Sequence, residues 1–229
     1  MCSSDLSLAE APCVLLKRSL NEVGIGVTPD NMEVDFVIYT NPDLPQALDS
    51  GAVDAIALVD PIATVGMNQY GFKMILDQAT NERYKDEYCC VTFVTKELAE
   101  KYPETAAAFT RAVMKASAWV QANPDETAAF LVEKEYLSGK PEVLGKILSS
   151  YVFTPSVQGG YNALANNVRE FIEIGLLDAS TDADAFIKDN FVFLDGVEET
   201  YSAKADPDKG TDIITVSDIV DSGLDDCCR

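Results

Sequence analysis

The chain has 229 residues, of which 47% are hydrophobic and 24% charged, enough for one large lobe or two small ones. The net charge of −21 excludes nucleic acid and anionic membrane surfaces as partners, because both are bound through a basic surface. The sequence contains no histidine, which excludes Ser-His-Asp and Cys-His catalysis and histidine-ligated metals. We therefore expect no metal and no cofactor.

The first residues look foreign to the rest of the chain. Read as codons, residues 1–6 correspond to the translation of a common sequencing adapter, and no basic segment followed by an apolar one marks a signal peptide. We expect residues 1–7 to be a non-native start and leave them out of the fold. The alternative is a native cytosolic start.

A helix is predicted over residues 12–23. Pro12 suits the first turn of a helix, and Val14, Leu20 and Val23 keep one apolar face. Gly24 is a suitable residue to end it.

The next segments alternate between strands and helices. Residues 33–39 alternate and are rich in Val, Phe and Ile, and residues 53–59 are nearly all apolar, so both are predicted as strands, with a third over residues 72–76. Asn41-Pro42 and Asp60-Pro61 each place a capping residue before a proline, the pattern of a helix start. The alternation predicts a parallel α/β sheet.

Helices dominate the remainder. A last strand is predicted over residues 88–94, and helices follow over residues 103–122, from 124 onward, 140–150, 158–175 and 182–188, with Asn123 as the cap of the second. Residues 196–229 hold nine acidic and three basic residues with few core formers, so they read as an acidic tail, with one strand at 213–216.

Several of these segments resemble a known family. Residues 47–55, Ala-Leu-Asp-Ser-Gly-Ala-Val-Asp-Ala, followed by Asp60-Pro61, resemble the second lobe of the substrate-binding proteins of nitrate, sulfonate and taurine importers. Segments within 94–129, 153–157 and 175–178 resemble the C-terminal helices of the same proteins. The likeness covers about residues 8–197 and depends on the order and spacing of the segments.

The resemblance implies a partial type 2 periplasmic-binding-protein fold, truncated at its N-terminus. Residues 8–87 would form the second α/β lobe, residues 88–195 the returning hinge strand and C-terminal helices, and residues 196–229 the tail. Because the first lobe would be absent, we expect the apolar side chains of Phe93, Phe109, Val113 and Val120 to be partly uncovered.

The function that the resemblance implies is solute binding for an ABC import system. Such a protein is not an enzyme: it captures a small molecule between two lobes, here nitrate, a sulfonate, taurine or a related nitrogen or sulfur compound, and delivers it to a membrane permease. The full-length parent would be periplasmic or at the cell surface. The alternatives are a ligand-sensing domain and an enzyme on the same fold, such as a relative of the thiamine-pyrimidine synthases, whose chemistry requires a histidine.

Candidate ligand contacts lie where the predicted strands end. Ligands of open parallel sheets bind beyond the carboxyl ends of the strands, beside helix N-termini, and Pro12, Asn41, Asp60 and Pro61 lie at that edge. Backbone amides at helix starts favour an anion, whereas Glu10 and Asp60 oppose one unless Asp60 caps its helix. A neutral or cationic nitrogen compound fits at least as well. The alternative role of Asn41 and Asp60 is capping alone.

Cys89 and Cys90 are further candidates. In a strand over residues 88–94 their side chains would point to opposite faces, so one could contact the ligand. They could bind a soft metal or a thiol-sensitive ligand, or form a vicinal disulfide. The alternative is that both are small buried hydrophobic residues.

Overall fold

A computed structural model describes residues 2–4 and 9–203, with side chains from residue 9 onward. The chain divides into two units. The first contains residues 1–89 and 161–191, and the second contains residues 90–160 and 192–229. In the described part of the chain no helix is long and apolar enough to span a membrane.

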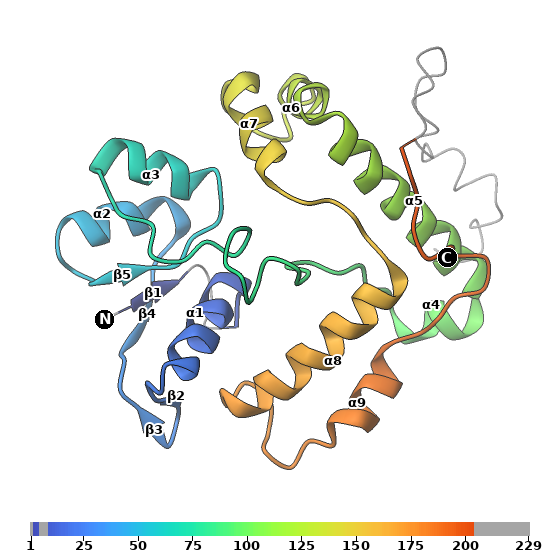
Figure 1. Cartoon of the computed structure of the whole chain (residues 1–229), viewed down its shortest axis with the longest axis horizontal. Helices are drawn as coiled ribbons and strands as arrows, with labels where there is room; N and C mark the ends of the chain where they lie inside the picture. Colours follow the sequence, from blue (N-terminus) through green and yellow to red (C-terminus); the bar gives the residue numbers. More distant parts are fainter. Residues whose placement is uncertain (1, 5–8, 204–229) are drawn as a thin grey trace. The chain divides into compact units, whose positions relative to one another are not determined.

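A three-stranded parallel sheet lies in the first unit. Its strands are β1 (Cys2–Ser4), β4 (Phe36–Ile38) and β5 (Ala55–Ile56), in the order β4-β1-β5 (Figure 1). Both outer strands run parallel to β1, which pairs Cys2 with Phe36 on one side and with Ala55 on the other. The parallel sheet was predicted, but its central strand comes from the residues that the sequence analysis left out of the fold.

A helix follows each strand of this sheet, as the capping and proline pattern predicted. The helix α1 (Ala11–Glu22) follows β1, and the short 3-10 helix η1 (Asn41–Asp43) leads into α2 (Leu44–Asp49) after β4. The helix α3 (Ile62–Tyr70) follows β5 and ends at Gly71, whose φ of 72° is the left-handed conformation that glycine adopts without strain.

A hairpin completes this part of the unit. The strands β2 (Val27–Thr28) and β3 (Asn31–Met32) pair antiparallel. The amide of Gly26 donates to Glu33 Oε2 at 2.6 Å, and a Cβ at Gly26 would lie 1.9 Å from the Asn31 carbonyl oxygen, so only glycine fits there. Val14, Val27 and Ile174 form a buried apolar cluster that packs α1 and the hairpin against the end of α8.

Two predicted strands do not form. Residues 72–76 and 88–94 have no strand in the structure. Ile75 is 91% exposed and Phe93 is 87% exposed. Their apolar runs therefore lack the cover on both faces that a buried parallel strand requires, and the prediction from composition alone was wrong.

The second unit is helical. Its helices are α4 (Lys96–Lys101), α5 (Pro103–Ala122), α6 (Pro124–Glu133), α7 (Pro141–Ser150) and the first turn of α8 (Val157–Glu173). The core is built from small side chains, because Ala106, Ala107, Ala118 and Ala128 are all buried. Small residues let helix backbones approach closely, and Gly145 of α7 lies against Asp125 of α6.

The junction of α5 and α6 corrects the expected cap. Asn123 is the residue before α6, but its side chain makes no capping bond. Its Nδ2 instead donates to the Trp119 carbonyl at 2.9 Å, and Thr127 Oγ1 donates to the Asn123 carbonyl at 2.7 Å. Asn123 therefore closes α5 with its side chain, while its backbone starts α6.

A segment of residues 192–203 holds the start of α8 within the second unit. The amides of Val157 and Gln158 donate to the carbonyl and the carboxylate of Glu199, at 3.1 and 3.0 Å. Arg111 Nη1 donates to the Gly196 carbonyl at 3.3 Å. The helix α9 (Ala183–Asn190), in the first unit, is capped at its start by Asp182, whose carboxylate accepts from the amides of Asp184 and Ala185.

The expected exposure of apolar side chains is confirmed. Phe93 and Phe109 are exposed, at 87% and 44%, and Val113 and Val120 are half-buried. The strand predicted at residues 213–216 lies outside the described residues, as does most of the acidic tail.

Candidate functional site

The carboxyl edge of the sheet is one candidate site. All three strands run in the same direction, so β1, β4 and β5 end at one edge, which we define by the described residues that follow them: 9–14, 39–44 and 57–64. From the central strand β1 the chain moves to β4 on one side and then crosses β1 to reach β5 on the other side, so the direction of winding reverses beside β1. Such a switch point is where open α/β sheets place a ligand.

The segment after β4 carries Asn41. Asn41 begins η1, is half-buried, and has a buried side-chain oxygen. Beside it, Thr40 Oγ1 donates to Asp43 Oδ2 at 2.7 Å, and the Thr40 carbonyl accepts from the Asp43 amide at 2.9 Å. The turn is therefore fixed by Thr40 and Asp43, and not by a capping bond from Asn41.

The segment after β5 carries Asp60 and Pro61. Asp60 Oδ1 accepts from the Thr64 amide at 3.0 Å and from Thr64 Oγ1 at 2.7 Å. Its carboxylate is therefore turned into the first turn of α3, which is the capping role that the sequence left open. Pro61 lies at the N-terminal boundary of α3 and is half-buried.

The segment after β1 carries Pro12. It occupies the first turn of α1, is half-buried, and brings no N–H donor to the edge. Glu10 precedes the helix with an exposed side chain that makes no capping bond. The fold thus brings Pro12, Asn41, Asp60 and Pro61 to one edge of the sheet.

The two cysteines differ from their prediction. Cys89 ends the first unit and Cys90 begins the second, and both are exposed in a segment without strand structure. They are not small buried residues, and the alternation expected of a strand does not apply. None of the described cysteines forms a disulfide.

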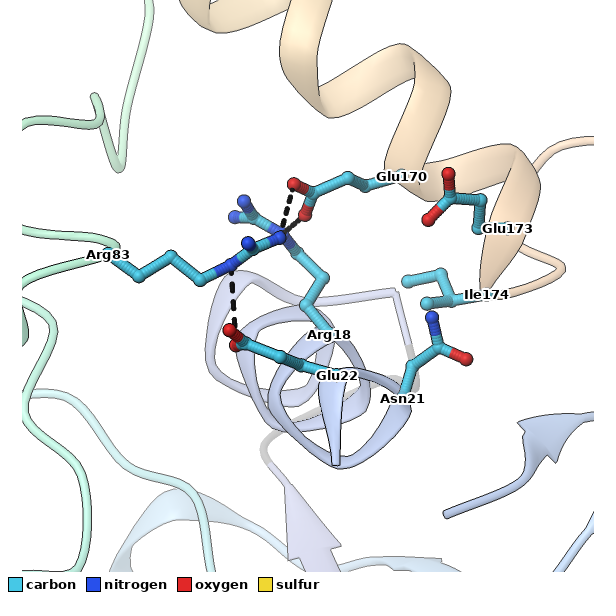
Figure 2. A pocket seen from close by; sticks show the side chains of 7 residues that line it. All are labelled: Arg18, Asn21, Glu22, Arg83, Glu170, Glu173 and Ile174. Atoms are coloured by element: carbon cyan, nitrogen blue, oxygen red, sulfur yellow. Dashed lines mark hydrogen bonds and ion pairs between the residues drawn. The ribbon is translucent and has the colours of Figure 1, made fainter. Parts of the chain in front are cut away.

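A second candidate, missed by the sequence analysis, is a small polar cavity inside the first unit (Figure 2). It has a volume of about 90 Å³ and is lined by residues of α1, of the loop before Cys89 and of the end of α8: Arg18, Asn21, Glu22, Arg83, Glu170, Glu173 and Ile174. The signal in the sequence was Arg18, which follows Val14 by one helical turn on the apolar face of α1.

Arg18 is the centre of this cluster. Its side chain is 6% exposed and pairs with Glu87 through two nitrogens, at 2.7 and 2.8 Å, and with Glu170 through Nε. Burial alone would lower the pKa of Arg18, but the hydrogen bonds and charges of Glu87 and Glu170 outweigh it and raise that pKa above its usual value. Arg18 therefore stays charged and pairs α1 with both partners.

Arg83 extends the cluster toward the surface. Its guanidinium lies between Glu22 at 3.3 Å and Glu170 at 2.8 Å (Figure 2). Burial lowers the pKa of Arg83, but the attraction of Glu170, a hydrogen bond with Tyr84 and the attraction of Glu22 together outweigh it, so that pKa is raised above its usual value. Tyr84 is 1% exposed, lies under both guanidinium groups, and donates to Glu22 at 3.0 Å.

This cluster is built for structure more than for chemistry. Its arginines are already paired with carboxylates, and neither a nucleophile nor a histidine lines the cavity. Among the described residues no group of three or more His, Cys, Asp or Glu could hold a metal ion. The cluster joins α1 to α8, and we assign it no ligand.

The parallel sheet with a helix after each strand has the form of an α/β lobe, a class of fold in which ligands bind at the switch point of the sheet. Comparison with known proteins narrows the class of protein. The model of the NMT1-like family matches residues 7–133, more than half of the chain, so the chain belongs to the NMT1-like family. No curated protein and no solved structure matches the chain.

Membership of this family has general implications for the fold and the function. It supports the assignment to the nitrate, sulfonate and taurine-binding group of proteins and suggests a periplasmic-binding-protein fold. Its members are generally binding proteins, not enzymes, and are typically extracytoplasmic. Membership is compatible with solute binding for an ABC importer, with a small-molecule ligand and a permease as the general partners.

Proposed function

We propose that this chain is the solute-binding component of an ABC import system and that it binds its solute at the carboxyl edge of the first unit. The solute would be nitrate, a sulfonate, taurine or a related nitrogen or sulfur compound, delivered unchanged to a membrane permease. The protein would act outside the cytoplasm and would have a type 2 periplasmic-binding-protein fold.

One observation carries this proposal. The strands β4 and β5 lie within the region matched by the family, residues 7–133, and β1 directly precedes it. Each of the three parallel strands is followed by a helix. The carboxyl edge, where these strands end, is the position at which open α/β sheets bind small molecules. The residues that we propose as ligand contacts at this edge are Pro12, Asn41, Asp60 and Pro61. A ligand contact at Cys89 and Cys90 stays a separate prediction.

A binding assay on the whole chain tests the proposal. Nitrate, ethanesulfonate, taurine and simple amines are added singly, binding is followed by amide chemical shifts in NMR spectra, and each compound is recovered afterwards. We expect at least one compound to saturate shifts in residues 39–44 and 57–64 and to be recovered unchanged. Conversion of the compound would favour the enzyme alternative, and no saturable shift with any compound would contradict the proposal.

Variants locate the site. Asn41→Ala removes a side chain at the edge and should weaken binding about three- to tenfold, the usual cost of one polar contact. Asn68→Ala, at an exposed position of α3 away from the helix start, is the matched control and should leave binding unchanged. Equal affinity of both variants and the original chain would remove Asn41 from the site.

A further inference from the structure

We infer that Cys89 and Cys90 form a redox switch: a small-molecule disulfide oxidises the two neighbouring thiols to a vicinal disulfide, and an excess of thiol reopens it. This inference goes beyond the proposed function and does not depend on it. It follows from the exposure of the two thiols, the covalent geometry of neighbouring residues and the backbone around them.

Both thiols are accessible from solution. Cys89 and Cys90 are exposed, whereas Cys13 in α1 is 0% exposed. Thiol–disulfide exchange requires that the attacking sulfur reach the other disulfide, so access separates these two cysteines from Cys13. Of the cysteines whose side chains the structure describes, Cys89 and Cys90 are therefore the ones that can react with a molecule as large as glutathione disulfide.

The chain itself keeps the two sulfur atoms close together. One peptide bond joins the residues, so their Cα atoms are about 3.8 Å apart if the bond is trans and about 2.9 Å apart if it is cis. This separation does not depend on the arrangement of the two units. Ordinary disulfides span about 4.4–6.8 Å between Cα atoms, so closing the ring strains the backbone. A strained and exposed disulfide is readily reduced, which suits a reversible switch and not a permanent cross-link.

The backbone around the pair can accommodate the ring. Residues 88–95 contain no helix or strand, and the next helix, α4, begins at Lys96. Closing the ring therefore disrupts no helical turn and no strand pairing. In a strand, adjacent side chains point to opposite faces, which would oppose a bond between them. The absence of the predicted strand at residues 88–94 removes that obstacle.

The ring would act on a connection between the two units. The chain passes from the first unit to the second between Cys89 and Cys90. In the first unit, Glu87 pairs with the buried Arg18 at 2.7 Å, so the chain is fixed two residues before Cys89. We therefore expect oxidation to change the backbone at residues 88–95 and to leave the Arg18 cluster as it is.

The reaction consists of two exchange steps. The thiolate of one cysteine attacks a sulfur of glutathione disulfide, forms a mixed disulfide and expels one glutathione thiolate. The thiolate of the other cysteine then attacks the protein sulfur of the mixed disulfide, closes the Cys89–Cys90 bond and expels the second glutathione thiolate. The two expelled thiolates take up the two protons that the cysteines lost, and glutathione disulfide gains the two electrons that the protein gives up.

The experiment uses the 229-residue chain with Cys227→Ser and Cys228→Ser, so that the second adjacent pair of the sequence takes no part. The reduced protein is treated with glutathione disulfide, the remaining thiols are blocked with N-ethylmaleimide, and the protein is digested with trypsin. Cleavage after Lys85 and Lys96 gives one peptide that contains both cysteines and no other. We expect most of this peptide to be two hydrogens lighter than its reduced form, with neither glutathione nor the blocking group attached. Excess glutathione should restore the reduced form.

Single variants provide the matched controls. Cys89→Ser and Cys90→Ser each keep one exposed thiol and cannot close the ring, so the same peptide should carry one glutathione. In NMR spectra, ring closure should shift the amides of residues 88–95 and leave those of β4 unchanged.

The other outcomes would overturn the inference. Glutathione attached to both cysteines at once, or a disulfide that joins two chains or involves Cys13, would show that the pair does not close on itself. A ring that excess glutathione does not reopen would be a permanent cross-link and not a switch. Unchanged amide shifts at residues 88–95 would show that oxidation does not alter the connection. None of these results would bear on solute binding at the carboxyl edge.

Discussion

Each of the two units is stabilised internally by a different kind of interaction. The first contains the one charged residue that is buried in the described part of the chain, Arg18, with Glu87 and Glu170 paired to it. The second has a core of alanines and close helix backbones. A buried ion pair determines which charged groups contact each other, and the loss of either partner is destabilising. Packing of small residues determines the distance between helices, and any added side-chain volume is destabilising.

The largest effect should come from removing the buried cation. Arg18→Met keeps much of the side-chain volume but leaves the Glu87 and Glu170 carboxylates without their shared partner. Loss of one member of a buried pair costs about 3–5 kcal/mol, and the partial exposure of both glutamates favours the lower end. Urea unfolding followed by circular dichroism measures the change.

A matched control tests whether burial is the cause. Arg169→Met removes the exposed pair with Asp184 and should change the free energy of unfolding by less than about 0.5 kcal/mol. The double variant Arg18→Met, Glu170→Gln should recover part of the loss. Equal effects of the two arginine substitutions would show that the cluster does not stabilise the first unit.

The same glycine-to-alanine change should have opposite effects in the two units. At Gly145 of α7 a Cβ would lie 2.3 Å from Asp125 Oδ1 and 3.3 Å from Asp125 Cα, so α6 or α7 must shift, at a cost of about 1–3 kcal/mol. At Gly66 of α3 the nearest atoms are 3.6 Å away, and alanine should stabilise by up to about 1 kcal/mol through its helix propensity. Thermal unfolding measures both, and a stabilising Gly145→Ala would contradict the close packing.

A smaller effect is expected at the start of α8. Glu199→Ala removes the carboxylate that accepts from the Gln158 amide, which should cost about 0.5–1 kcal/mol, the value of a helix cap. Hydrogen exchange at residues 157–160 should become faster. Glu198→Ala, where only the backbone amide is used, is the control and should leave exchange unchanged.

The smallest effect concerns a fully exposed charge in the first unit. Hydrogen bonds from the Ser180 hydroxyl and amide lower the pKa of Asp178 below its ordinary value of 3.8. Ser180→Ala should raise that pKa, which an NMR titration of the carboxyl carbon measures, while Ser180→Thr should keep it low. Because the folded pKa is depressed, any stabilisation is present above the ordinary pKa and is lost as the pH falls through the folded value. An unchanged pKa in the alanine variant would assign the shift to the backbone amide.

The sequence predicted the helices better than the strands. Proline and capping signals marked the starts of α1, η1, α5 and α6 because these signals act within one turn of the chain. The runs at 72–76 and 88–94 had strand composition, but strands form by pairing with distant segments, and composition does not report a partner. The central strand, Cys2–Ser4, was missed for another reason: residues 1–7 were interpreted as a non-native start and left out of the fold, so their pairing with β4 and β5 was not predicted.

The candidate site divides in the same way. Asn41, Asp60 and Pro61 were located by local patterns, and the parallel strands bring them to one edge. The Arg18 cluster was missed because the two glutamates that pair with Arg18 lie 69 and 152 residues away along the chain. Local sequence patterns do not report contacts between residues so far apart. For Cys89 and Cys90 the expected alternation does not apply, because the strand at residues 88–94 does not form and both are exposed; their role as ligand contacts stays a prediction.

The position of Trp119 has a practical consequence for spectroscopy. It is the one tryptophan of the chain and lies half-buried in α5, with its carbonyl bonded to Asn123. Emission excited at the red edge of the absorption band therefore originates in the second unit alone, whereas Tyr84 absorbs within the charged cluster of the first. The protein carries its own reporter for one of its two units, so fluorescence and circular dichroism can follow their unfolding separately without any attached label.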